Sequence, residues 1–246
     1  QATFQREDGI VVVDNKRCVG CAYCVQACPY DARFINHETQ TADKCTFCEH
    51  RLEVGLLPAC VESCVGGARV IGVVENQAPT RALEADLPVR DGLIEAEGEI
   101  CQIALVERHR GTGGVVNGFV SGFGYRGRVA VASTVAHDSH HMIVVGTDRQ
   151  TMAAAANHLG DIGGGVTVFR DGAELATVAL PIAGLMSDLP APEVAEAAQA
   201  IVRAMQDCGC TLNNAYMQHS LLALVVIPEL RISDLGIVDV REFRIV

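Results

Sequence analysis

From residue 70 onward the chain consists of short apolar runs rich in β-branched residues, with glycine between them. Runs of this kind are typical of β-strands. We expect strands at residues 70–74, 100–106, 129–135 and 142–145, and one more at residues 10–14 near the N-terminus. The second half is therefore predicted to be rich in sheet.

Two stretches of the same half show the spacing of apolar residues that is typical of helices. The first spans residues 147–165, where Thr147-Asp148 can cap the first amides and three glycines end the helix. The second runs from about residue 192 to 206 and stops at Gly209. Its expected apolar face comprises Val194, Ala197, Ala198, Ile201, Val202 and Met205.

Two glycine-containing motifs refine this picture. Asp171-Gly172 lies between two apolar runs and predicts a β-hairpin. Residues 122–127 match Gly-x-Gly-x-x-Gly, but the strand-like residues 128–135 follow instead of the helix that a dinucleotide site needs. We therefore expect no dinucleotide site there, and an α+β fold for the second half.

Composition and charge exclude several classes of function. The 246-residue chain has a net charge of −11, with 49% apolar and 20% charged residues, which is typical of a globular protein that does not bind nucleic acid. The longest apolar run of the second half, residues 221–227, is far shorter than the roughly 20 residues of a membrane-spanning helix. We see no export signal, and expect a cytoplasmic or membrane-peripheral protein.

Cysteine is concentrated in the first quarter of the chain, where eight of the eleven cysteines lie. The first four follow the spacing Cys-x-x-Cys-x-x-Cys-x-x-x-Cys-Pro, and the others form a Cys-x-x-Cys pair and a Cys-x-x-x-Cys pair. The eight are Cys18, Cys21, Cys24, Cys28, Cys45, Cys48, Cys60 and Cys64. Two-residue gaps let three thiolates surround one iron–sulfur cube, while the fourth points toward a second cube.

In two-cluster ferredoxins each cube takes its fourth ligand from the other cysteine group. One [4Fe-4S] cluster would then be held by Cys18, Cys21, Cys24 and Cys64, and the other by Cys28, Cys45, Cys48 and Cys60. Two alternatives stay open: a disulfide framework, which is typical of exported chains, and a pair of zinc sites. We expect one or two [4Fe-4S] clusters.

A family resemblance is carried by the segment CVGCAYCVQACPYDARFINHETQTADKCTFCEHRLEVGLLPACVESCVGGAR. It resembles the electron-transfer subunit of molybdopterin oxidoreductases of the tetrathionate, polysulfide and dimethyl sulfoxide reductase type, over about residues 6–69. The resemblance implies a ferredoxin-like module that works between a membrane anchor subunit and a molybdopterin catalytic subunit. Such subunits carry four cysteine groups, of which this chain has the last two. Because the family pairs the third group with the second and the fourth with the first, each cube lacks a ligand here unless the groups re-pair or a partner chain completes it.

A second resemblance is carried by the stretches VVENQAPTRALEADLPVRDG, ALVERHRGTGG, GFVSGFG, VASTVAHDSHHMIVVGT, LPIAGLMSD and VVIPELRISDLGIVDV. These are similar to the C-terminal region of bacterial adenine deaminase. That family is an amidohydrolase, in which a metal pair in a (β/α)8 barrel activates the water that converts adenine to hypoxanthine and ammonia. The resemblance implies a manganese requirement if this half is functional.

The deaminase-like half is too short to contain the barrel of that family. A (β/α)8 barrel takes about 200 residues or more, and residues 70–246 show neither eight strand–helix units nor a His-x-His metal motif. We therefore expect no complete barrel and no catalytic residue in this chain. Deamination would require a barrel from elsewhere.

Three smaller polar features remain as candidates for chemistry. Three imidazoles and a carboxylate lie within five residues and could bind metal or simply shape a turn; they are His137, Asp138, His140 and His141. Glu107-Arg108-His109 either faces substrate or forms an internal ion pair. Cys208 and Cys210 are expected to be incidental thiols.

The two resemblances meet near residues 64–72 without a linker. Because natural fusions usually join whole domains through an exposed segment, we interpret the chain as a composite of two family fragments, a ferredoxin-like module at residues 1–69 and a deaminase-like domain at residues 70–246. We expect electron transfer through [4Fe-4S] clusters, with an adenine deaminase fragment as the alternative. The expected partners are a molybdopterin catalytic subunit, a membrane anchor subunit, and a second copy bound through the C-terminal domain.

Overall fold

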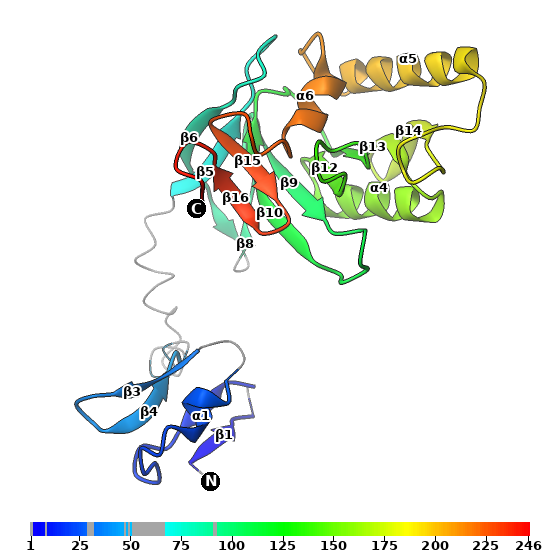
Figure 1. Cartoon of the computed structure of the whole chain (residues 1–246). Helices are drawn as coiled ribbons and strands as arrows, with labels where there is room; N and C mark the ends of the chain where they lie inside the picture. Colours follow the sequence, from blue (N-terminus) through cyan, green and yellow to red (C-terminus); the bar gives the residue numbers. More distant parts are fainter. Residues whose placement is uncertain are drawn as a thin grey trace. The chain divides into compact units, whose positions relative to one another are not determined.

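A computed structural model describes residues 2–7, 9–28, 32–46, 48, 50, 67–90 and 93–246 (Figure 1). The chain divides into two compact units, residues 1–65 and residues 66–246, which we call the N-terminal unit and the C-terminal unit. Within the described ranges, no helix combines the length and the apolar character needed to cross a membrane.

The N-terminal unit contains two small antiparallel pairs of strands and one helical turn. β1 (Thr3–Gln5) pairs with β2 (Val11–Val13), which confirms the strand expected at residues 10–14. β3 (Arg33–Asn36) pairs with β4 (Thr41–Lys44), and α1 (Tyr23–Gln26) lies between β2 and β3 in the chain.

Polar contacts join the two pairs of strands. The Lys44 ammonium donates a hydrogen bond to the Val11 carbonyl at 2.6 Å, and Arg33 Nη1 donates to Thr3 Oγ1 at 3.0 Å. Val12 and Ala42 are the only buried apolar side chains among the described residues of this unit. Since buried apolar area is the main source of folding energy, the described part of the unit has little hydrophobic stabilisation of its own.

The C-terminal unit is built on an eight-stranded sheet of order β14-β13-β11-β12-β9-β10-β5-β6. β5 and β10 run parallel, whereas the other neighbouring strands are antiparallel. The strands are β5 (Gly67–Gly72), β6 (Arg81–Asp86), β9 (Ile100–Val106), β10 (Val115–Ser121), β11 (Val129–Ser133), β12 (Met142–Gly146), β13 (Gly165–Arg170) and β14 (Ala173–Ala179). The four strands expected in this half are confirmed as β5, β9, β11 and β12.

The larger core lies on one face of this sheet. It is covered by α5, α6 and the antiparallel strands β15 and β16, to which β17 is added (Figure 1). These elements are α5 (Ala191–Asp207), α6 (Ala215–Leu221), β15 (Leu230–Ser233), β16 (Gly236–Asp239) and β17 (Arg244–Ile245). Every second residue of β9, namely Cys101, Ile103 and Leu105, is buried in this core.

The opposite face carries a smaller core under α4 (Arg149–Asp161). This helix packs across β11, β12 and β13 through Met152, Ala155 and Leu159. Gly146 at the end of β12 permits the close approach, because a Cβ there would collide with Met152 Cγ and with the Val129 carbonyl. A separate short pair, β7 (Val89–Arg90) and β8 (Leu93–Ile94), completes the described strands.

The two expected helices and the expected hairpin are confirmed as α4, α5 and the β13–β14 pair. The apolar face expected for α5 is wrong in two positions, since Ala198 and Val202 are exposed and Ala204 is buried instead. The α+β fold class is confirmed, and the described residues form an open sheet rather than a barrel. The residues 122–127 loop leads into strand β11, as its sequence predicts.

Candidate functional site

The first three cysteines lie on the loop that follows β2 and on the helical turn α1. Two residues of this loop adopt left-handed backbone conformations, Gly20 with φ +67° and Ala22 with φ +58°. A Cβ at Gly20 would collide with the Gln40 carbonyl, so the loop folds directly against the β3–β4 turn. Cys18 and Cys21 lie on this loop, and Cys24 lies on the helical turn that follows it.

Sulfur takes part in the hydrogen bonding of this loop. The Ala42 amide donates to Cys18 Sγ at 3.2 Å, and the Cys18 amide donates to the Asp14 carbonyl at 3.0 Å. Cys21 and Cys45 are exposed, whereas Cys18, Cys24, Cys28 and Cys48 are half-buried. The proposed ligands Cys60 and Cys64 lie outside the described residues.

The donor set fits an iron–sulfur cluster. Soft thiolates are the ligands that such clusters take, and a backbone amide directed at sulfur tunes their potential. In the part of the chain that the structure describes, no three His, Cys, Asp or Glu side chains are close enough to hold a single metal ion. A cube spreads its four thiolates over four iron atoms, so this observation concerns single-ion sites.

The histidine-rich residues 137–141 connect β11 to β12. Arg108 fixes this loop: its Nε donates to the His140 carbonyl at 2.6 Å, and its Nη2 donates to the Ala183 carbonyl at 2.9 Å. His109 Nε2 lies 2.6 Å from the Ser139 carbonyl. The loop is therefore held by its backbone, which leaves its side chains outside these hydrogen bonds.

The imidazoles of this loop separate into two pairs. The His137 and His140 ring centroids are 5.5 Å apart, and the His141 ring is 4.7 Å from that of His109. His141 is only 7% exposed, and its Nε2 lies 3.8 Å from the carboxylate of Asp234. Burial lowers the pKa of His140 and of His141, so both are neutral at pH 7.

The side chains of Glu107 and Arg108 bond to the backbone rather than to each other. The Glu107 carboxylate accepts hydrogen bonds from the amides of His109, Arg110 and Thr112 and from the Thr112 hydroxyl. The Thr112 and Arg110 amides in particular lower the pKa of Glu107 to about 2. Glu107 thus organises the turn after β9, and this part of the polar patch is structural.

The three cysteines of the C-terminal unit are buried and free. Burial raises the pKa of Cys101 to about 12 and also raises the pKa of Cys208 and of Cys210. A thiol of this kind is a poor nucleophile and a poor metal ligand at neutral pH, because the thiolate is the reactive form.

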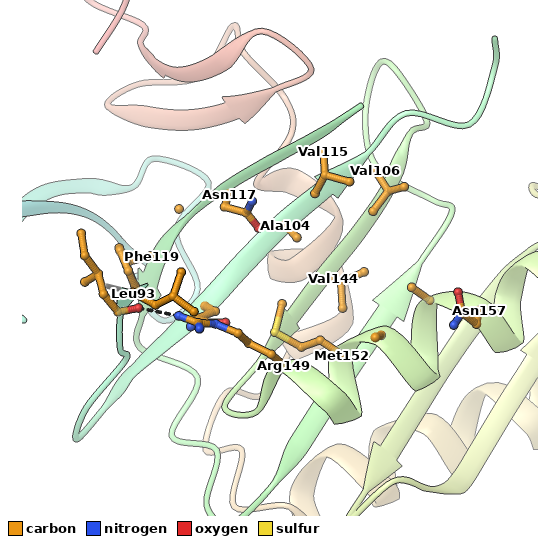
Figure 2. A pocket seen from close by; sticks show the side chains of 15 residues that line it. Leu93, Ala104, Val106, Val115, Asn117, Phe119, Val144, Arg149, Met152 and Asn157 are labelled. Carbon is orange, nitrogen blue, oxygen red and sulfur yellow. Dashed lines mark hydrogen bonds between the residues drawn. The ribbon is translucent and has the colours of Figure 1, made fainter. Parts of the chain in front are cut away.

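The sequence did not indicate a cavity of about 770 Å³ on the sheet face beside α4 (Figure 2). Its floor comes from β9, β10 and β12, and its walls from α4 and β8. No apolar alternation marks β10, whose sequence is VVNGFVS, so the sequence carried no clear signal for the cavity.

Comparison with known proteins finds a different family for each part of the chain. The "4Fe-4S dicluster domain" matches residues 1–74, and the "Adenine deaminase C-terminal domain" matches residues 77–244. The chain is 91% identical over 76 residues to a subunit of tetrathionate reductase from Salmonella typhimurium, a stretch covering 31% of this chain and 30% of that protein.

The C-terminal unit has relatives among adenine deaminases. It is 87% identical over 178 residues to adenine deaminase of Paracoccus denitrificans and 79% identical over 177 residues to that of Ruegeria sp. strain TM1040. Each match covers 72% of this chain and 30% of the relative, so the chain spans about a third of the length of these proteins. Both expected resemblances are confirmed, and because the deaminase domain matches more than half of its length, the chain belongs to the adenine deaminase C-terminal domain family.

Proposed function

We propose that the N-terminal unit transfers electrons through [4Fe-4S] clusters, in a chain that is a composite of two family fragments. The carrying observation is the set of eight cysteines within a segment that is 91% identical to a tetrathionate reductase subunit and matches a 4Fe-4S dicluster domain. One cluster would be held by Cys18, Cys21, Cys24 and Cys64, and the other by Cys28, Cys45, Cys48 and Cys60.

The structure supports this proposal in two ways. The Ala42 amide already donates to Cys18 Sγ, and hydrogen bonds of this type to a ligand sulfur set the potential of a cluster. In addition, Val12 and Ala42 are the only buried apolar side chains in the described part of the unit. A unit with so small a core gains stability when a metal group links its segments.

A cluster supplies reversible one-electron redox chemistry when bound, and the chain's own residues hold it and separate it from water. A molybdopterin catalytic subunit and a membrane anchor subunit are the proposed redox partners. The similarity to a subunit of tetrathionate reductase supports a place in a reductase complex.

The test is native mass spectrometry and visible spectroscopy on anaerobically purified full chain. Two bound cubes, with a visible absorbance that dithionite bleaches by donating one electron to each cluster, are the expected result. Cys24→Ser should remove one cube, whereas Cys101→Ala in the C-terminal unit should retain both. An intact chain that binds no iron or sulfide after reconstitution would exclude electron transfer by this molecule.

A second candidate function rests on a separate observation, the 87% identity of the C-terminal unit to an adenine deaminase. We propose that this unit is the accessory part of such an enzyme and acts only beside a catalytic barrel supplied by another chain. Manganese would then be the metal of that barrel. The expected result is no ammonia release from adenine by this chain alone with added manganese, and the appearance of turnover would overturn the accessory role.

A further inference from the structure

One face of the eight-stranded sheet is covered only in part. On this face β9 and β10 present three directly opposite pairs, Val106 with Val115, Ala104 with Asn117, and Gln102 with Phe119. These residues form the floor of the cavity of about 770 Å³ (Figure 2). We call this surface the open face.

The covering by α4 stops at the edge of the open face. The helix packs on β11, β12 and β13, and its Met152, Ala153 and Ala156 form one wall of the cavity. The opposite wall is β8, which Arg149 of α4 holds by donating from Nη2 to the Ile94 carbonyl at 2.8 Å. Floor and walls together make a groove bordered by the helix on one side and by β8 on the other.

The groove is apolar and accessible. Val115 on its floor is 50% exposed and Leu93 on its wall is 52% exposed. Asn117 and Asn157 supply amide groups, and Arg149, the one charged residue among the described residues of the lining, already donates to the Ile94 carbonyl. A surface of this composition fits an apolar protein segment with a few hydrogen-bonding groups, rather than a charged ligand.

The opposite face of the sheet, by contrast, is covered by helices and strands of the C-terminal unit itself. There α5 packs on β13 and β14, α6 on β12, and the β15–β16 pair on β10, and together they bury one continuous core. No described element does the same on the open face beyond α4 and β8. The missing layer must therefore come from outside the described part of the C-terminal unit if the apolar floor is to be buried.

The comparisons indicate one source for that layer. The deaminase of Paracoccus denitrificans contains this unit at 87% identity, yet the matched stretch is only 30% of its length. The remainder of that protein is covalently attached to the same domain, which keeps it at a high effective concentration beside the surface of the domain. We infer that the open face is the surface on which the catalytic part of an adenine deaminase docks; this inference rests on the second candidate function.

Radical footprinting with mass spectrometry compares the full 246-residue chain with the intact Paracoccus deaminase, at the same radical dose. We expect severalfold lower labelling in the intact deaminase of the residues that match Val115 and Leu93. Equal labelling in both proteins would overturn the docking surface. Ammonia release from adenine by the 246-residue chain alone, with added manganese, tests the second candidate function separately, whichever way the footprint falls.

A second copy of this chain is the competing occupant. If it covers the open face, labelling of Val115 and Leu93 falls as the chain is concentrated, and Val115→Asp restores the labelling of Leu93 and the monomer mass in light scattering. That result would also overturn the inference. Val202→Asp, on the exposed side of α5, is the matched control and should change neither measurement.

Discussion

His219 shows how one buried side chain makes stability depend on pH. Its ring is fully buried, with Nε2 at 3.2 Å from the Val131 carbonyl, and burial lowers its pKa from 6.5 to about 4. Above pH 6.5 the ring is neutral in both states. As the pH falls from 6.5 to 4 the unfolded chain binds the proton first, so stability is lost across that window, by about 3 kcal/mol.

The substitution His219→Leu removes this titration. We expect the free energy of unfolding to fall by about 3 kcal/mol less between pH 7.5 and pH 4 in the variant than in the parent chain. Urea unfolding followed by circular dichroism at both pH values measures the difference. The pKa values of His140 and His141 are also lowered, so these two residues contribute to the pH dependence of the unfolding free energy that remains in the variant. An equal change in unfolding free energy between the two pH values in both proteins would show that His219 does not cause the pH dependence.

Arg231 is a buried cation that bonds to carbonyl oxygens. The residue is 1% exposed, and its guanidinium donates to the carbonyls of Ile227 at 2.7 Å and of Leu221 at 3.0 Å, and also to that of Ala78. Burial lowers its pKa to about 10, so it stays charged at neutral pH. Three backbone segments are thereby joined at one side chain.

Replacing Arg231 with methionine fills the volume but leaves these carbonyls without donors. Each unsatisfied buried acceptor costs about 1–3 kcal/mol, so we expect Arg231→Met to lower the free energy of unfolding by about 3 kcal/mol. Arg231→Lys should retain only part of this unfolding free energy, because the lysine ammonium lacks the planar, forked donor geometry of the guanidinium. Denaturant unfolding of the parent and the two variants measures these differences in stability. A methionine variant as stable as the parent would contradict a stabilising role for the Arg231 hydrogen bonds.

Among the elements, α4 depends on its N-terminal cap. The Asp148 carboxylate accepts hydrogen bonds from the Thr151 amide at 2.8 Å and from the Thr151 hydroxyl at 2.7 Å. We expect Asp148→Ala to cost about 1 kcal/mol of unfolding free energy and Asp148→Asn to cost less, because asparagine also caps. Thermal and urea unfolding of the two variants measure the losses. The exposed contact with Arg128 at 3.3 Å adds little. Equal losses in both variants would assign the effect to charge instead.

The elements that sequence could predict are those with local signals. The cap at Asp148 and the stop at Gly209 define α4 and α5, and the β-branched residues define β9 and β11. β6 could not be predicted, because its sequence RALEAD suits a helix and becomes a strand only through pairing with β5. The short strands β15 and β16 likewise depend on contacts with the sheet.

The candidate sites also divide into features with a local sequence signal and features that depend on contacts between distant residues. The cysteine spacing is a local signal, so the grouping of three cysteines within one short segment follows from the sequence alone. The approach of His141 to Asp234 joins residues more than ninety positions apart, which no spacing rule reveals. The open face depends on where α4 stops relative to β9 and β10, and so it emerges only in the folded unit.

At the scale of the whole molecule, the two units differ in what stabilises them. Both apolar cores that the described residues form lie in the C-terminal unit. The described part of the N-terminal unit buries only Val12 and Ala42 among its apolar side chains. The C-terminal unit is therefore stabilised by packing. The N-terminal unit is stabilised by hydrogen bonds and, on our proposal, by bound clusters.

Removing the clusters should therefore affect one unit and spare the other. We expect an iron chelator with an oxidant to abolish the visible absorbance and to speed hydrogen exchange at the Ala42 amide, which donates to Cys18 Sγ. Amides of β9 and β11, in the core of the C-terminal unit, should exchange as slowly as before. Exchange that accelerates in both units would mean that the clusters stabilise the chain as one cooperative structure. Unchanged exchange at Ala42 would mean that the N-terminal unit folds without them.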